Sequence, residues 1–183
     1  MPFEFLSGAV ALDFVATVGE RTTKRTETLT GVADLAAWLK QARLLDTPVE
    51  VTEADLAEAK ELREALYEYL VALTAGARLP AAAVKVINAR AAHPTPVVRL
   101  AGGGTPVREG TARAALSSLA RSGIRLAGAE TVSAIRWCAD DTCTRPFLDR
   151  SRGRRRRWCG MSGCGDRAKA AAYRRRRRAS ADR

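Results

Sequence analysis

The sequence predicts a mainly α-helical protein, in which a multihelical N-terminal domain with a small β-hairpin precedes a four-cysteine module that ends in a basic helix. Apolar residues recur at helical spacing through most of the first 126 positions. All four cysteines follow residue 137, and residues 131–183 carry 16 lysines and arginines against 5 acidic residues. Residues 1–130 hold 15 residues of each sign, so the whole excess of +11 lies in the C-terminal part. These breaks predict domains at 1–130 and 131–183, with the boundary within Gly128–Ser133.

The first elements of the N-terminal domain follow from apolar spacing and breakers. The continuous apolar segment Gly8–Val18 fits a short buried helix or strand, and we favour a helix. Polar residues 19–30 predict a loop, and residues 32–44 then show helical spacing until Pro48. Thr52 followed by Asp55 resembles a capped helix start, and Gly76 is expected to end that helix.

The second half of this domain changes pattern. Residues 81–92 predict a further helix, which Pro94 and Pro96 stop. Residues 96–100 and 105–108, joined by three glycines, predict the hairpin. Residues 111–126 restore a helical pattern, with an expected interruption at Gly123.

Composition excludes several classes of protein. No apolar run approaches the roughly 20 residues needed to cross a bilayer. The apolar stretch Phe3–Val18 lacks a basic leader and contains Asp13, so it does not resemble a signal peptide, and we expect a cytoplasmic protein. His93 is the only histidine, and no nucleophile motif, phosphate-binding loop or carboxylate pair is present, so we expect no enzymatic activity and no catalytic residues.

The cysteines are spaced C-x4-C, fifteen residues, C-x4-C, at Cys138, Cys143, Cys159 and Cys164. Two short loops can each turn a pair of thiolates toward one tetrahedral Zn²⁺, so the spacing predicts a structural four-cysteine zinc finger. Four protein ligands leave no open position for a catalytic water. A redox dithiol or unligated buried cysteines are the alternatives.

The residues around the cysteines resemble a known family. Phe147–Arg152, Arg156–Met161 and Cys164–Lys169, together with Cys138 and Cys143, resemble the CGNR zinc finger. That finger usually accompanies an N-terminal helical domain called ABATE, whose opening resembles Leu12–Thr17 with Asp34-Leu35 and Trp38-Leu39. The resemblance implies a stress-related bacterial transcription regulator. Asp166 replaces the family's signature asparagine, and Ala16 replaces the asparagine expected before Thr17.

The basic C-terminal part is expected to bind nucleic acid, because such charge density is tolerated against a polyanion. The candidate contacts are Arg152, Arg154, Arg155, Arg156, Arg157, Arg167, Lys169, Arg174, Arg175, Arg176, Arg177 and Arg178. We expect loop arginines, Arg154 and Arg156 among them, to specify sequence and the five terminal arginines to bind phosphates. The terminal run also fits a solvated tail.

Two places beside these arginines have two interpretations each. Trp158 fits either packing inside the finger or a platform for base stacking. Asp149, Ser151 and Arg152 fit either a hydrogen-bonded loop with an internal ion pair or phosphate binding.

The sequence therefore favours a DNA-binding transcription regulator whose partner is double-stranded DNA. Its N-terminal domain is expected to form a homodimer or to sense an unknown small molecule. An RNA- or ribosome-binding protein and a zinc-stabilised protein-interaction adaptor are the alternatives.

Overall fold

The computed structural model describes residues 3–181, with side chains through Arg178. Its helical part contains α1 (Val10–Val15), α2 (Val32–Gln41), α3 (Glu53–Thr74), α4 (Ala81–Ala91), α5 (Ala112–Arg125) and the short α6 (Ala129–Val132). The C-terminal part contains the single-turn element η1 (Met161–Gly165) and α7 (Asp166–Ala181). Three small antiparallel pairs join β1 (Val18–Gly19) to β2 (Thr26–Glu27), β3 (Val97–Leu100) to β4 (Pro106–Glu109), and β5 (Ile135–Trp137) to β6 (Pro146–Leu148). The predicted mainly α-helical fold is confirmed.

The long helix α3 begins and ends where the sequence predicts. The Thr52 hydroxyl accepts a hydrogen bond from the Asp55 backbone N–H at 3.1 Å, and the Asp55 carboxylate accepts one from the Thr52 N–H at 3.0 Å. This reciprocal box satisfies two donors that the first turn leaves unpaired. After the helix, Gly76 adopts a φ of +63°, in the left-handed region that glycine occupies without a steric cost.

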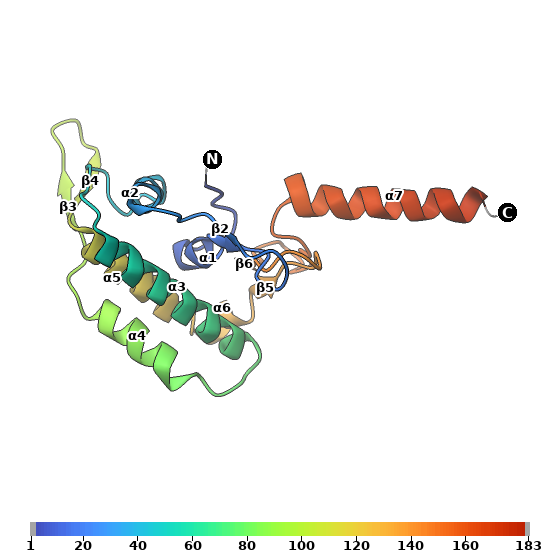
Figure 1. Cartoon of the computed structure of the whole chain (residues 1–183), viewed down its shortest axis with the longest axis horizontal. Coiled ribbons are helices and arrows are strands. Elements are labelled where there is room, and N and C mark those ends of the chain that lie inside the picture. Colours follow the sequence, from blue (N-terminus) through green and yellow to red (C-terminus); the bar gives the residue numbers. More distant parts are fainter. Residues whose placement is uncertain (1–2, 182–183) are drawn as a thin grey trace.

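The core lies between α1, α3 and α5, and α4 covers α3 and α5 (Figure 1). The expected interruption at Gly123 is wrong, because α5 continues to Arg125. A Cβ atom at Gly123 would lie 2.3 Å from Cδ2 of Leu66 on α3. The glycine therefore allows two helices to approach closely.

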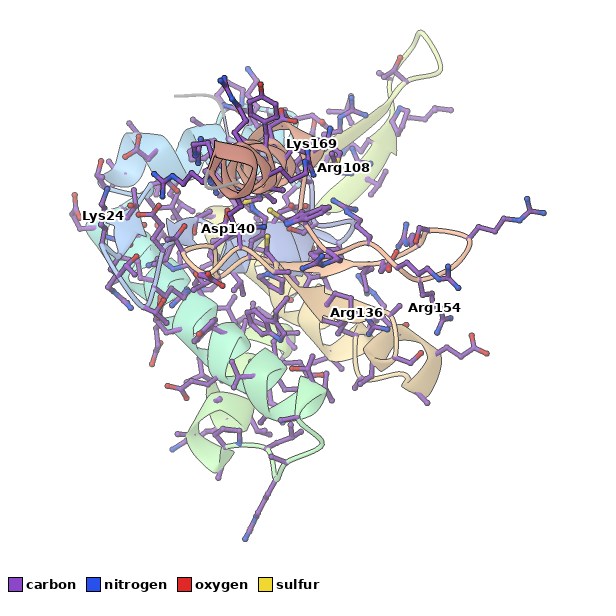
Figure 2. The ribbon with its side chains drawn as sticks, turned by 90° about the vertical axis from the view of Figure 1, so that its right-hand side faces the viewer. Lys24, Arg108, Arg136, Asp140, Arg154 and Lys169 are labelled. Carbon is purple, nitrogen blue, oxygen red and sulfur yellow. The ribbon has the colours of Figure 1, made fainter. Side chains whose placement is uncertain are left out.

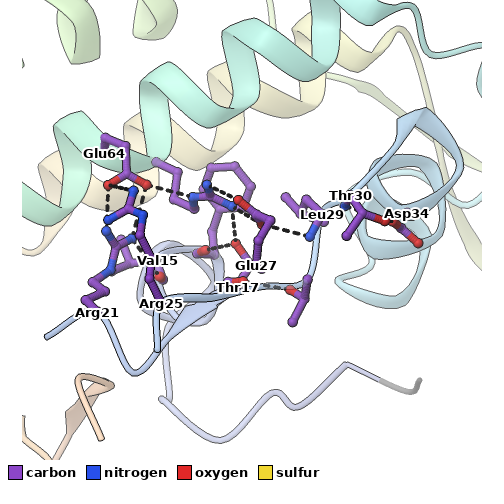
Figure 3. A network of polar contacts seen from close by, with 12 residues as sticks. Val15, Thr17, Arg21, Arg25, Glu27, Leu29, Thr30, Asp34 and Glu64 are labelled. Carbon is purple, nitrogen blue, oxygen red and sulfur yellow. Dashed lines mark hydrogen bonds and ion pairs between the residues drawn. The ribbon is translucent and has the colours of Figure 1, made fainter. Parts of the chain in front are cut away.

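The predicted loop 19–30 contains β2 and the second residue of β1, and a polar network ties this segment to α3 (Figure 3). Arg63 is 2% exposed and donates to both carboxylate oxygens of Glu27, at 2.7 and 2.6 Å, and to the Thr17 hydroxyl. Arg21 pairs with Glu64 at 2.6 Å. Each buried guanidinium thus has a carboxylate partner, as a buried charge requires.

The hairpin β5–β6 joins the two parts of the chain. Ile135 and Leu148 are buried in the same apolar cluster as α1, α3 and α5. The Leu148 N–H donates to the Ser7 carbonyl at 2.8 Å, and the Trp137 indole N–H donates to the Thr74 hydroxyl at 3.0 Å. The C-terminal part is therefore packed against the helical part through its first hairpin, and the domain boundary near residue 130 stays a prediction.

Two elements project from this body (Figure 1). The hairpin β3–β4, which confirms the predicted one, pairs Val97 with Glu109 and Leu100 with Pro106. At the opposite end, α7 extends away from the rest of the molecule. Among the helices that the structure describes, none is both long and apolar enough to cross a membrane.

Candidate metal centre and basic surface

The four cysteines converge from separate segments. Cys138 follows β5, Cys143 lies in the turn before β6, Cys159 ends the long loop after β6, and Cys164 lies in η1. All four Sγ atoms lie within 4.8 Å of one another, and the Cys143–Cys159 and Cys159–Cys164 separations are 3.8 and 3.7 Å. A tetrahedral Zn²⁺ with bonds of about 2.3 Å requires sulfur separations of about 3.8 Å. The donor set fits zinc, and the four cysteines form no disulfide.

The acid–base chemistry of the thiols also fits a cation. A hydrogen bond from the Cys159 thiol, against the effect of burial, lowers the pKa of Cys143 to about 5. The hydrogen bond to Cys143, with burial, raises the pKa of Cys159, and burial together with the Cys143 charge raises the pKa of Cys164 to about 12. One thiolate therefore opposes ionisation of its neighbours. A divalent cation removes that repulsion, because it binds the deprotonated form of each ligand.

Arg167 and Asp140 support the cysteines. An Arg167 Nη atom donates to Sγ of Cys164 at 3.0 Å, and Arg167 Nε donates to Asp140 at 3.0 Å. Asp140 also accepts from the backbone N–H and the hydroxyl of Thr142, at 3.1 and 2.8 Å. Burial opposes ionisation of Asp140, but the bonds from Thr142 and Arg167 lower its pKa. Asp140 was not predicted from the sequence as a residue of the site, although its place two residues after Cys138 was the available signal.

Asp149 fixes the loop that carries the arginine run. Its carboxylate accepts from the backbone N–H and the hydroxyl of Ser151, at 3.0 and 2.6 Å, and from the Arg156 N–H at 2.9 Å. The bonds from Ser151, together with the one from Arg156, lower the pKa of Asp149. Asp149 and Ser151 thus have the loop-fixing role. Arg152 forms no ion pair with any residue that the structure describes, so the internal ion pair of the first interpretation is not present there.

Arg156 and Trp158 belong to the interior of the finger. Arg156 donates to the carbonyl of Trp158 at 2.9 Å and to that of Cys159, and its guanidinium lies 4.6 Å from the centre of the Phe147 ring. Trp158 is partly buried against the cluster of Phe147 and the cysteines. The Arg157 guanidinium lies over the Trp158 ring, 5.1 Å from its centre. Packing is thus the role that Trp158 has in this structure.

The other candidate basic residues are exposed and form two groups. The loop group contains Arg152, Arg154, Arg155 and Arg157, and the helix group contains Arg167, Lys169 and Arg174–Arg178. Figure 2 shows Arg154 to the side of α7 and Lys169 on that helix. Arg154 has a φ of +47° and donates to the Ser133 hydroxyl at 2.9 Å, while Lys169 lies 3.7 Å from Asp166.

A groove of about 660 Å³ runs between α7 and residues 139–142. Arg157, Trp158, Arg174 and Arg175 line it, with Asp140 and Asp141 on the facing segment. The helix itself has 16 residues and is about 24 Å long at 1.5 Å per residue. The structure therefore presents a long basic helix beside a finger loop on which Arg152, Arg154, Arg155 and Arg157 are exposed.

Comparison with known families agrees with this geometry. The ABATE family model, described as "Putative stress-induced transcription regulator", matches residues 8–130, which is more than half of the chain. The CGNR zinc finger model matches residues 135–177. No curated protein matches the sequence. Together with the clustered cysteines, the second match identifies Zn²⁺ as the metal of this site, and neither family is described as an enzyme.

Proposed function

The chain belongs to the ABATE family and carries a CGNR zinc finger, and from this premise we propose that it regulates transcription by binding double-stranded DNA. In this proposal Cys138, Cys143, Cys159 and Cys164 hold one structural Zn²⁺. The observation that carries the proposal is the projecting helix α7, whose arginines Arg174–Arg178 are all exposed. A cytoplasmic location belongs to the same proposal, because reduced cysteines and DNA are found together there.

The distribution of charge around α7 favours a duplex. Successive residues of a helix turn by about 100°, so five consecutive arginines point in all directions around the axis. The major groove of B-DNA is about 12 Å wide, admits an α-helix and has phosphates along both edges. Arginines on opposite sides of α7 can then each reach a phosphate strand.

The loop supplies a second set of contacts. Arg152 and Arg155 are exposed, and their guanidinium groups form no hydrogen bond or ion pair with any residue that the structure describes. Asp149 and the metal ligand Cys159 limit the motion of the loop on which they lie. Rigid donors suit the reading of base edges, so we assign sequence discrimination to Arg152 and Arg155. Arg156 and Arg167 receive a different role, because their donors already bind groups of the finger.

The experiment is crosslinking of the full-length protein in cells, followed by sequencing of both the recovered DNA and the recovered RNA. We expect discrete DNA peaks that disappear when Arg174–Arg178 are replaced by alanine. A matched control replaces the exposed basic residues Arg78 and Lys85 of the helical part and is expected to keep the peaks.

Other outcomes contradict the proposal. Abundant RNA reads without DNA peaks would show an RNA-binding protein. Recovery of neither nucleic acid, with the protein folded and zinc-loaded, would favour a protein-interaction adaptor.

A further inference from the structure

A cavity of about 640 Å³ lies between the helical part and the finger. Its walls come from the segment before α1, from α1 itself, from β2 and from α2, and Arg145 of the finger closes one side. The residues that line it include Phe3, Asp13, Glu27, Asp34, Trp38 and Arg145. The volume is within the range of small-molecule sites.

Three of the four carboxylates in this wall already have partners. Glu4 pairs with Arg145 at 2.8 Å, and Glu27 pairs with Arg63 at 2.6 Å. Asp34 accepts hydrogen bonds from Thr30 and from the Gly31 N–H at the start of α2. Figure 3 shows Glu27 and Asp34 with these neighbours. They therefore need nothing from a ligand.

Asp13 is the exception. Its side chain lies in the cavity wall and the residue is 6% exposed, but it forms no ion pair with any residue that the structure describes. Its carboxylate accepts a hydrogen bond from the Ser7 N–H, at 2.9 Å. Burial raises the pKa of Asp13 despite this bond and despite the charge of Arg145. A cation that entered the cavity would compensate the buried carboxylate.

Two aromatic residues also line the cavity, together with Ala16 and four threonines. Trp38 is 1% exposed and lies between the rings of Phe5 and Phe14, with centroid separations of 5.7 and 5.0 Å. Phe3 and Trp38 both line the cavity. Aromatic rings beside a carboxylate favour a ligand that combines positive charge with an apolar body.

We propose that this cavity binds an organic cation, an ammonium or amidinium group on an aromatic or aliphatic body, with the charge against Asp13 and the body against Trp38. The site belongs to both parts of the chain, because the side chain of Arg145 lines it while the Arg145 carbonyl accepts from the N–H of Cys138. Such a ligand would therefore bind next to the metal loop.

The test is a calorimetric titration of the full-length, zinc-loaded protein with three probes of one shape. These are 2-phenylethylammonium, the neutral 2-phenylethanol and the anionic 3-phenylpropanoate. We expect saturable binding of one ammonium probe per chain, with an affinity at least about tenfold above that of the alcohol, and no binding of the carboxylate. No DNA is present, so the result is independent of the proposed DNA binding.

Two variants locate the charge that is recognised. Asp13→Asn keeps an oxygen acceptor for the Ser7 N–H. We expect this variant to bind the ammonium probe with an affinity at least about tenfold lower, and to bind the alcohol with an unchanged affinity. Glu50→Gln removes an exposed carboxylate outside the cavity and should leave all three probes unchanged.

Each remaining outcome overturns the proposal. Equal binding of ammonium and alcohol would leave an apolar pocket without charge recognition. Preference for the carboxylate would assign the site to Arg145 and an anion. The proposed site would also be contradicted if the ammonium probe showed no saturable binding up to about 10 mM, or if it bound Asp13→Asn as tightly as the native chain.

Discussion

Arg155 and Arg156 are neighbours in the sequence but differ in what their side chains contact. The Arg156 guanidinium donates to the carbonyls of Trp158 and Cys159, whereas the Arg155 guanidinium forms no hydrogen bond or ion pair with any residue that the structure describes. Arg156→Ala removes the charged donor of two hydrogen bonds to backbone carbonyls at the metal ligand Cys159. Each such bond contributes about 1.5–3 kcal/mol to the stability of the folded state. We expect a chelator to remove zinc from this variant at least about tenfold faster.

Arg155→Ala is the matched variant. It should release zinc at the unchanged rate, because an exposed side chain without contacts changes stability by less than about 0.5 kcal/mol. Its affinity for a selected target duplex should instead fall, with little change of the log–log salt slope, because we assign Arg155 to base edges and not to phosphates. Faster zinc loss from Arg155→Ala than from Arg156→Ala would contradict both assignments.

Asp13 predicts a dependence of stability on pH. Because burial raises its folded-state pKa above the unfolded value, the protonated form favours folding. Its stabilising contribution is complete below about pH 4, the unfolded pKa, and is lost as the pH rises through the folded pKa. Asp13→Asn lacks this loss, so it should have a higher Tm than the native chain at pH 7 and little advantage near pH 4. Thermal denaturation across this range measures the difference, and a lower Tm at pH 7 would contradict it.

For single residues, the sequence predicts those roles that depend only on spacing along the chain. The cysteine spacing was sufficient to identify the metal site, because two short loops turn their own sulfurs toward one point. The roles of Asp140 and Arg145 depend on contacts with α7 and with Glu4, which are distant in sequence. A run of four arginines cannot reveal that only Arg156 turns inward.

Helices were predicted best where a cap or a breaker marks them. Thr52 and Gly76 bound α3 as expected, since each acts within its own turn. The strands β1 and β2 have two residues each, too short for an alternating pattern, and Arg63 on α3 holds β2 through Glu27. Gly123 was predicted to interrupt a helix, but it lies within α5. The neighbouring helix α3 leaves no room for a side chain at this position, and the sequence alone does not show that contact.

The helix α7 and the loop are expected to divide affinity from discrimination. If Arg174–Arg178 neutralise about five phosphates, replacing them by alanine should flatten the log–log salt slope by about 4.5. Phosphates are the same in every sequence, so affinities for a selected target and a random duplex should fall together. Alanine keeps the helix, so the change is one of charge.

The loop variant is the comparison. Replacing Arg152 or Arg155 by alanine should lower the target-to-random ratio by roughly 5- to 150-fold, the effect of about 1–3 kcal/mol, with little change of slope. Titrations at several salt concentrations measure both quantities. Loss of discrimination in the α7 variant, with discrimination kept by both loop variants, would reverse the two roles.

Zinc should support the whole molecule as well as the finger. Metal binding contributes on the order of 10 kcal/mol to a small zinc module, so Cys159→Ser should unfold the finger. Ile135 and Leu148 then leave the main core, and the helical part loses about 1.5–3 kcal/mol of stability for each of these buried side chains. We expect the helical part still to melt cooperatively, at a Tm lower by roughly 10 °C. Elemental analysis should give one zinc per native chain, and circular dichroism follows the melting.

A fragment of residues 1–128 tests the domain boundary in the same way. We expect it to fold with a Tm close to that of Cys159→Ser, because both lack the same contacts. A molten fragment would show that the boundary near residue 130 does not separate two folding units. A metal-free protein with an ordered C-terminal part would contradict the zinc site.

The shared hairpin limits how this finger can be reused. A module that is stable by itself can be transplanted between proteins, but β5–β6 buries Ile135 and Leu148 against a helical partner outside the finger. Leu148 also donates its N–H to Ser7 of that partner. A transplanted finger would therefore carry an uncovered apolar patch and an unpaired strand edge, both of which promote aggregation. Protein engineers who move it to a new host would need to supply a matching surface or replace these two side chains with polar ones.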